Sequence, residues 1–171
     1  LKNGVPTINL PAVSIEGELT LEETNLAFTP ESRVTPKDLL QCHDLLFNWR
    51  NGSREHLGKA AYFSSVGKYT HVGFLLRIRA NPQLCNPKFL WWMLYFLRKQ
   101  GFFLKAKSQV NNTFNSQELA NVIFAIPPLA EQLYIVNVLD SQDAVIQNET
   151  NELEKLKIIK QGLMQDLLTG K

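Results

Sequence analysis

Ile126-Pro127-Pro128-Leu129-Ala130-Glu131-Gln132 divides the chain, because a helical pattern begins here and continues to Lys171. Proline disrupts the interior of a helix but is favourable at its first position, so the proline pair predicts a helix that starts at Leu129. Beyond it there is no further proline, and Gly162 is the one glycine inside the pattern. At about 1.5 Å per residue an unbroken helix of this length would extend roughly 60 Å. It would therefore project beyond any domain that the 128 preceding residues could build.

One apolar stripe runs along this predicted helix. Its members recur at intervals of three, four or seven residues, which places them on a single face. They are Ile146, Leu153, Leu156, Ile159, Leu163 and Leu167. A stripe this narrow is typical of a coiled-coil seam, so we expect it to pair with an equivalent helix as a dimer or subunit contact. Asp140-Ser141 has the chemistry of a helix cap, which predicts a short helix followed by a long one.

The residues before Leu129 alternate short apolar runs with turn signals, which is the pattern of strands. We expect strands at residues 6–10, 12–15, 19–21, 44–49, 57–63, 72–78 and 122–126. Asn86-Pro87 opens an almost wholly apolar run, which predicts a helix buried against a sheet. The sequence therefore predicts an α+β fold. A domain with a mixed or antiparallel sheet and a buried helix spans residues 1–128, and a long coiled-coil-like helical region spans residues 129–171.

The positive charge of the chain is concentrated in its middle. The net charge is only +2, but residues 48–112 carry eleven Lys and Arg against one acidic residue, Glu55. The flanking parts are acidic: residues 1–47 hold three bases and seven acids, and residues 129–171 hold four bases and seven acids. A concentrated basic segment is the expected footprint of a surface that binds nucleic-acid phosphates. Ordinary solvated lysines would give the same count, so both interpretations stay open at this point.

Asn51-Gly52 is the strongest turn signal in the chain and lies between two predicted strands. The tip of this hairpin presents Arg50, Asn51, Ser53, Arg54 and His56 together. Arginine suits guanine edges or phosphates, asparagine suits adenine, and serine donates to phosphate. The tip is therefore our first candidate for reading DNA bases. The alternative is a polar turn that happens to be basic.

A second polar loop follows Lys105 and Lys107, and its amide side chains have the chemistry to read adenine. Together with lysines expected to anchor phosphates, the two loops give one set of candidate DNA-binding residues. The set is Arg50, Asn51, Gly52, Ser53, Arg54, Lys59, Lys68, Tyr69, Lys105, Lys107, Gln109, Asn111 and Asn112. The aromatic helix after Pro87 is better explained by core packing than by base stacking.

The chain lacks the motifs of enzymes that act on DNA. Metal-dependent nucleases need paired carboxylates with a nearby lysine, but no Asp-x-Lys or Glu-x-Lys occurs. Residues 86–89 are the nearest approach to a methyltransferase motif, yet lysine replaces its second proline and no glycine-rich loop precedes them. Three scattered histidines give no ligand spacing for zinc. We therefore expect no catalytic residue, no metal site and no cofactor.

Cysteine usage and hydropathy place the chain among cytoplasmic proteins. Cys42 and Cys85 lie far apart in unrelated contexts, so we expect two free, buried thiols in a reducing compartment. No apolar run approaches the roughly 20 residues that cross a bilayer, and no charged-then-apolar leader opens the chain. No membrane partner is therefore expected. The chain begins with Leu1 rather than methionine, which is consistent with further residues ahead of it.

Four segments of the helical region, taken in order, resemble the conserved region of type I restriction–modification specificity subunits. They are residues 126–132, 139–140, 153–157 and 160–171. The predicted domain carries further resemblance at residues 4–8, 44–47, 50–53 and 57–59. The tryptophan and Leu-Gly pair that open the domain in this family are absent from the chain.

The resemblance implies a DNA target-recognition domain followed by a spacer helix, which would direct a prokaryotic defence complex to a bipartite site on double-stranded DNA. In that family the helix sets the distance between two recognition domains and docks the methyltransferase subunits, which connect to the restriction subunit. Methylation of adenine from S-adenosylmethionine and DNA cleavage would belong to those partners.

One domain and one helix leave two alternatives for the assembly. The chain is either half of a longer subunit or a subunit that works as a homodimer and reads a palindromic split site. Two rival interpretations of function also remain. One is a non-specific nucleic-acid binder, and the other is a protein-assembly module that dimerises through its helix.

Overall fold

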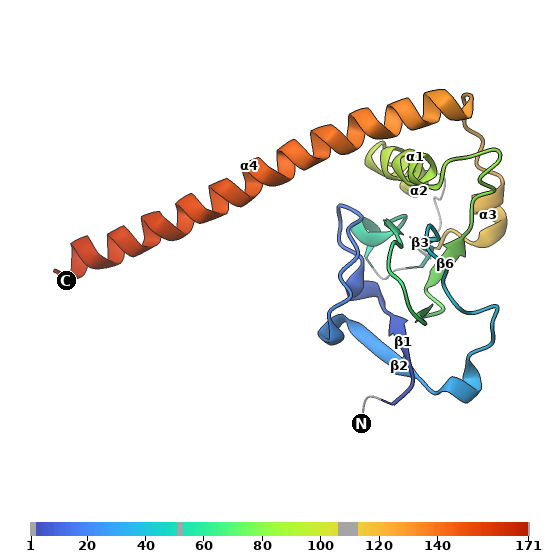
Figure 1. The fold of residues 1–171 in the computed structure, drawn as a ribbon, viewed down its shortest axis with the longest axis horizontal. Coiled ribbons are helices and arrows are strands. Elements are labelled where there is room, and N and C mark those ends of the chain that lie inside the picture. Colours follow the sequence, from blue (N-terminus) through green and yellow to red (C-terminus); the bar gives the residue numbers. More distant parts are fainter. Residues whose placement is uncertain (1–2, 51–52, 106–112, 171) are drawn as a thin grey trace. The chain divides into compact units, whose positions relative to one another are not determined.

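The computed structural model describes residues 3–50, 53–105 and 113–170 of the chain. They belong to two compact units, residues 1–132 and residues 133–171 (Figure 1). We call these the N-terminal unit and the helical unit. One continuous helix, α4 (Leu129–Thr169), connects the two units, and its first turn belongs to the N-terminal unit.

The outer sheet of the N-terminal unit is mixed. Its strands are β1 (Val5–Ile8), β2 (Leu26–Thr29) and β5 (Thr70–His71), in the order β2-β1-β5. β1 pairs antiparallel with β2 and parallel with β5. Short 3₁₀ helices at Leu10–Ala12, Glu23–Asn25 and Glu31–Arg33 lie among the connections. This sheet and the helices confirm the predicted α+β class.

The inner sheet is antiparallel. Its strands are β3 (Leu45–Asn48), β4 (Ala60–Tyr62) and β6 (Leu75–Ile78), in the order β4-β3-β6. All four residues of β3 are buried, so both faces of this central strand are covered. That double coverage explains why Leu45, Leu46 and Phe47 are apolar in succession instead of alternating with polar residues. The antiparallel pairing of β3 with β4 confirms that the two predicted strands pair.

Two hydrophobic clusters lie on opposite faces of the inner sheet. Successive side chains of a strand alternate between faces, and Leu46 joins Ile8 and Phe63 in one cluster. Leu45 and Phe47 join the other cluster, which also includes Trp91, Leu94 and Phe103. The inner sheet therefore lies between the outer sheet on one side and two helices, α1 (Pro87–Lys99) and α2 (Phe102–Lys105), on the other (Figure 1).

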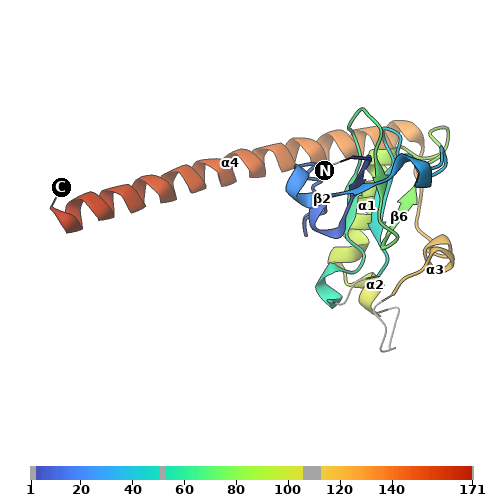
Figure 2. The ribbon, with the colours of Figure 1, turned by 90° about the horizontal axis from the view of Figure 1, so that it is seen from below.

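Helix α1 begins where the sequence predicts. The Asn86 carboxamide oxygen accepts hydrogen bonds from the backbone N–H groups of Lys88 and Phe89, at 2.8 and 3.2 Å, and Pro87 occupies the first helical position. The indole N–H of Trp91 donates to the carbonyl of Ala60 on β4 at 2.8 Å. Figure 2 shows α1 overlapping the strands of the inner sheet, as expected for a helix packed on its face.

Several predicted strands are not strands. Residues 122–126 have no regular structure in the stretch between α3 (Ser116–Ala120) and α4, although they are apolar. Ile123 is 95% exposed, so this segment is apolar but has no strand beside it with which to pair. Residues 12–15 and 19–21 contribute only one isolated bridge, Val13 to Leu19, because Gly17 turns the chain with a φ of +84°.

Helix α4 is unbroken over 41 residues, so the prediction of two helices is wrong. Ser141 does not cap a new helix. Its hydroxyl donates to the carbonyl of Asn137 at 2.6 Å, one turn back along the same helix. Gly162 is also accommodated inside the helix, at a cost of about 1 kcal/mol relative to alanine.

The start of α4 is fixed by one buried side chain, Gln132, which is fully inaccessible to solvent. Its amide group donates to the carbonyls of Pro127 and Leu84, at 2.7 and 3.1 Å. Its carboxamide oxygen accepts from the backbone N–H of Asn86 at 2.7 Å. A buried amide is stable only when its polar atoms are paired, as they are here. These bonds tie the first turn of α4 to the residues that cap α1.

Candidate nucleic-acid interface

The roots of the two predicted reading loops lie side by side. Arg50 and Thr113 form an isolated antiparallel bridge, and the backbone N–H of Phe114 donates to the carbonyl of Trp49 at 2.6 Å. Residues 51–52 and 106–112, which hold much of both loops, lie outside the described residues. The fold therefore brings together two segments that are more than 50 positions apart in the sequence.

An aromatic cluster packs against the residues that form these loop roots. Phe103 of α2 packs edge-on against Phe47 of β3 and against Phe114, with ring centroids 5.1 Å apart in both cases. Gly58, in the turn that leads from the first loop to β4, has a φ of +77°. A Cβ atom there would lie only 2.4 Å from the Phe103 ring, so this position requires glycine. The residues that flank both loops therefore pack against one buried aromatic cluster.

The side chains at the first loop root face solvent. Arg50 and Ser53 are exposed, and Ser53 precedes a 3₁₀ helix, Arg54–His56. The indole N–H of Trp49 donates to the carbonyl of Gly73 at 2.7 Å, which fixes the chain just before Arg50. An exposed arginine on a fixed backbone has the geometry to contact a phosphate or a guanine edge.

Several predicted site residues cannot be placed by this structure. Those outside the described residues are Asn51, Gly52, Lys107, Gln109, Asn111 and Asn112. For Arg54 and Lys105 only the backbone is described: the first opens the 3₁₀ helix and the second ends α2. Their assignment to DNA binding therefore stays a prediction.

Lys59, one of the expected phosphate anchors, does not lie on the open surface. It is 5% exposed, and its ammonium group donates to the carbonyl of Val13 at 2.5 Å. Desolvation by burial, followed by the nearby charge of Arg98, lowers its pKa. Lys59 is therefore reached from outside only through the pocket that it lines.

Lys68 and Tyr69 belong to a different part of the N-terminal unit. Lys68 is exposed in the turn before β5, and Tyr69 packs edge-on against Phe63, with ring centroids 5.5 Å apart. Tyr69 contacts the cluster between the two sheets, whereas the loop roots rest on the cluster under α1 and α2. The structure therefore does not bring Tyr69 into the group around Arg50.

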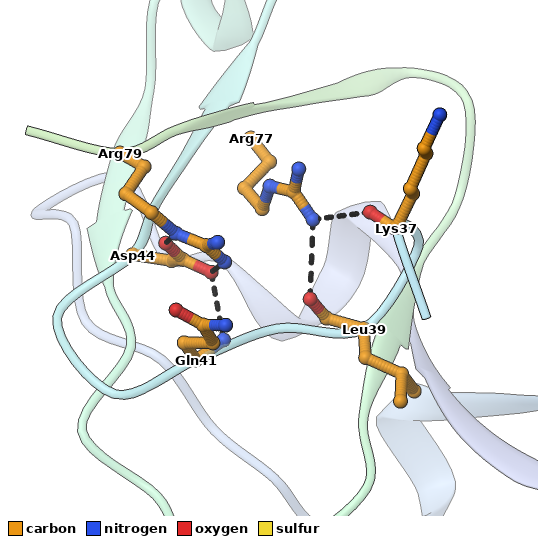
Figure 3. Close-up of polar contacts among 6 residues, drawn as sticks. All are labelled: Lys37, Leu39, Gln41, Asp44, Arg77 and Arg79. Atoms are coloured by element: carbon orange, nitrogen blue, oxygen red, sulfur yellow. Dashed lines mark hydrogen bonds and ion pairs between the residues drawn. The ribbon is translucent and has the colours of Figure 1, made fainter. Parts of the chain in front are cut away.

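Two arginines of the basic segment make contacts within the fold (Figure 3). Arg79 makes a two-pronged ion pair with Asp44, with both N···O distances 2.7 Å, and donating these hydrogen bonds to Asp44 raises the Arg79 pKa. Arg77 donates to the carbonyls of Lys37 and Leu39, at 2.5 and 3.1 Å. Asp44, which is 1% exposed, also accepts from the backbone N–H of Gln41 at 2.7 Å.

Helix α1 uses three more bases internally. Arg98 donates to the carbonyls of Ile15 and Glu55, at 2.7 and 2.8 Å. Lys99 pairs with Glu16 at 2.8 Å, and this contact, followed by a hydrogen bond from Tyr95, lowers the pKa of Glu16. Lys88 lies 4.4 Å from the centre of a Trp91 ring. The basic footprint is therefore narrower than the sequence implies, because only Arg50 and Lys68 are exposed bases without a structural role among its described side chains.

The described residues contain no group of three or more His, Cys, Asp or Glu side chains placed to hold a metal ion. Both cysteines are free, but Cys42 is exposed, so the expectation that both are buried is wrong for that residue. Burial raises the pKa of the Cys85 thiol, which keeps it protonated. In the described parts of the chain, no helix combines the length and apolarity needed to cross a bilayer.

The helical unit presents the second candidate surface. The predicted seam residues are between 50% and 79% exposed. Their positions on one face follow from the continuous helix, since residues three or four apart lie above one another. Off the seam, Lys155 pairs with Glu152 and Lys157 pairs with Glu154, both at 2.6 Å, which adds modest support to the exposed helix.

Comparison with protein families gives one match over most of the chain. Residues 35–158 match the family described as the type I restriction modification DNA specificity domain. This range includes the inner sheet, both loop roots and a large part of α4.

A protein named as the MjaX type I restriction enzyme specificity subunit of Methanocaldococcus jannaschii is 33% identical over 173 residues. The match covers 98% of this chain but 40% of that protein. This chain therefore spans less than half the length of that relative.

Two solved structures share the fold. One is a chain from a study of complex assembly and conformational transition in the type I R-M system, with a TM-score of 0.66 and 20% identity over 96% of this chain and 38% of that chain. The other is the HsdS subunit of Thermoanaerobacter tengcongensis, with a TM-score of 0.62 and 15% identity over 84% of this chain and 37% of that one.

Proposed function

The chain belongs to the type I restriction modification DNA specificity domain family, and from this premise we propose that it gives DNA sequence specificity to a type I restriction–modification complex. Its N-terminal unit would bind one half of a bipartite site. The long helix would connect that unit to a second recognition domain and to the partner subunits.

The observation that carries this proposal is the bridge between Arg50 and Thr113. It places the roots of two loops together, and the loops contain arginine, lysine and amide side chains. Recognition of a base pair needs side chains that reach its edge while other groups hold the backbone. Two adjacent loops on a rigid base can divide these tasks. We propose that Lys68, Lys105 and Lys107 hold phosphates, and that Arg50, Asn51, Ser53, Arg54, Gln109, Asn111 and Asn112 probe base edges.

Methylation and cleavage are proposed to occur on partner subunits. The sequence lacks the carboxylate and glycine-rich motifs that those reactions require. Methyltransferase subunits would supply the S-adenosylmethionine chemistry, and a restriction subunit would join through them. The complex would work in the cytoplasm, where chromosomal and invading DNA are both accessible.

The assembly is proposed to pair two such chains through the seam on α4. One N-terminal unit and one helix would read a single half-site, so two copies related by a twofold axis would read two identical halves in inverted orientation. The exposed seam residues support this proposal, because a long helix with an uncovered apolar row is stabilised by a second helix.

The direct test is selection of bound duplexes from a random DNA pool on the full chain, combined with light scattering of the protein alone. We expect enrichment of a short motif that occurs as two inverted copies separated by a fixed gap. The solution mass should be near twice the 19.5 kDa of one chain.

Other outcomes discriminate the alternatives. A single enriched half-site with a monomeric mass would keep the specificity role and discard the homodimer. Equal binding of all sequences, weakening uniformly with salt, would identify a non-specific nucleic-acid binder and overturn the proposal. A dimer that binds no DNA would identify an assembly module.

A further inference from the structure

A pocket beside the first loop has a buried ammonium group in its wall. The pocket has a volume of about 370 Å³, and Ser14, His56 and Lys59 supply its polar lining. His56 ends the 3₁₀ helix that begins at Arg54, so the pocket lies directly after the loop at residues 50–54. Of these polar lining residues, Lys59 was among the candidate DNA-binding residues expected from the sequence, whereas Ser14 and His56 were not.

The charge of Lys59 has no carboxylate partner among the described residues. Its bond goes to the neutral carbonyl of Val13, and the charge that acts on it most is another cation, Arg98. Buried lysines are ordinarily paired with an acid, because desolvating an unpaired ammonium group is costly. An ammonium group has three N–H donors, so Lys59 retains donor capacity beyond its bond to Val13.

Two further nitrogen atoms near the pocket are also buried without a hydrogen-bond partner in the described part of the chain. One is the Nδ1 atom of His56, a residue that lines the same pocket as Lys59. The other is the Nε atom of Arg98, whose two terminal nitrogens are already bonded to carbonyls. Buried polar atoms are rarely left unpaired, so such a group suggests a ligand that completes it.

The acidic side chains nearby do not fill this role. Glu55 lines the neighbouring pocket, which it shares with Arg98. Glu16 pairs with Lys99 and Tyr95. The Ser14 hydroxyl oxygen accepts from the backbone N–H of Glu18 at 3.0 Å, which leaves its O–H free to donate into the pocket. The pocket is therefore rich in donors and poor in negative charge.

We propose that this pocket binds a phosphate group, held by the ammonium group of Lys59, the hydroxyl of Ser14 and His56 in the tautomer that carries its proton on Nδ1. A phosphate offers several strong acceptor oxygens and a negative charge, which are the features that the pocket lacks. Two sources have this chemistry: a backbone phosphodiester of DNA and free inorganic phosphate.

The position of the pocket favours DNA as the source. A duplex read by residues 50–54 would carry its backbone past His56, which follows them in the same turn. This part of the inference rests on the proposed function. The phosphate chemistry of the pocket does not.

Calorimetric titration of the full chain with inorganic phosphate, against chloride at matched ionic strength, tests the pocket itself. Saturable binding is expected, and His56→Leu or Lys59→Met should weaken it by about tenfold each, as for loss of one charge-assisted hydrogen bond. His71→Leu is the matched control, because His71 bonds to the carbonyl of Val72 at a separate site. Its phosphate affinity should be unchanged.

A second arm identifies the source, by measuring the salt dependence of binding to a duplex of unrelated sequence. If the phosphate comes from DNA, Lys59→Met should reduce the slope of log Kd against log salt by about one. If Lys59→Met leaves this slope unchanged while the wild-type chain binds inorganic phosphate, the pocket is assigned to free phosphate. If Lys59→Met fails to fold, the affinities of His56→Leu for inorganic phosphate and for the duplex distinguish the two sources.

Two outcomes would overturn the proposed phosphate site. One is that the wild-type chain does not bind phosphate and the variants bind DNA as it does. The other is that His71→Leu weakens phosphate binding as much as His56→Leu or Lys59→Met. If the wild-type chain binds no DNA at all, the proposed function fails, while the phosphate titration still judges the pocket.

Discussion

The N-terminal unit and the helical unit differ in how far they bury their apolar side chains. In the N-terminal unit, Phe47, Phe63 and Phe103 are among the most buried side chains. In the helical unit, the seam residues remain at least half exposed. The first unit therefore has a core of its own, whereas the second needs a partner, because an isolated helix gains most of its stability by packing an apolar face. Stability and assembly should accordingly respond to different substitutions.

The largest effect should come from the core under the loop roots. Phe103→Ala removes the ring that packs against Phe47 and Phe114, and it should lower the free energy of unfolding by about 3–5 kcal/mol. Denaturant unfolding followed by circular dichroism measures this. Phe74→Ala, at an exposed phenylalanine, should cost less than about 1 kcal/mol. Equal costs for the two variants would mean that the aromatic cluster does not stabilise the unit.

The next effect concerns the arginines that hold the fold together. Arg79→Ala leaves the Asp44 carboxylate buried with only the Gln41 N–H, at an expected cost of about 2–3 kcal/mol. Arg33→Ala, at an exposed arginine on a 3₁₀ helix, is the control and should be near neutral in the same unfolding experiment. If instead Arg79→Ala leaves stability intact and weakens DNA binding, Arg79 belongs to the DNA-binding surface.

The seam should affect assembly but not the stability of the N-terminal unit. Leu156→Ala should weaken association by about 2 kcal/mol, roughly 30-fold in Kd, because it removes buried apolar area from the helix pair. Sedimentation or light scattering across a concentration series measures it. Ile158→Ala lies off the seam on the same helix and should leave the Kd within about twofold. Indistinguishable Kd values for the two variants would contradict pairing through this face.

The smallest effect is a pH dependence at the surface of α1. Hydrogen bonding from Lys99, then from Tyr95, lowers the pKa of Glu16 below its ordinary value of 4.5. Its contribution is therefore present above the unfolded pKa and is lost as pH falls through the folded one.

Glu16→Gln should accordingly reduce stability near neutral pH by less than about 1 kcal/mol, and the difference from wild type should shrink below pH 4.5. Unfolding midpoints measured between pH 3 and pH 7 check this, with Glu18→Gln as control. A difference that grew on acidification would contradict the sign.

The sequence by itself determined the features that depend on neighbouring residues. Pro127 and Pro128 predict the start of α4, and Asn86-Pro87 predicts the start of α1, because capping and proline geometry act within one turn. The apolar run Leu45-Leu46-Phe47 predicts β3, and ordered segments along the chain resemble the family that the comparisons support. The Asp140-Ser141 break was wrong because a serine inside a helix can bond one turn back instead of capping.

Only the tertiary structure decided which charged residues are available for a ligand. Arg79 meets Asp44, Arg98 meets Ile15 and Lys59 meets Val13, across separations of 35, 83 and 46 residues. No local pattern specifies such pairs, since they depend on how the two sheets and α1 pack. The same packing joins Arg50 to Thr113 and leaves Ile123 without a strand partner. A count of basic residues can therefore suggest a nucleic-acid binder, but the fold decides which of them remain available, because several basic side chains donate to carbonyls and carboxylates of the protein itself.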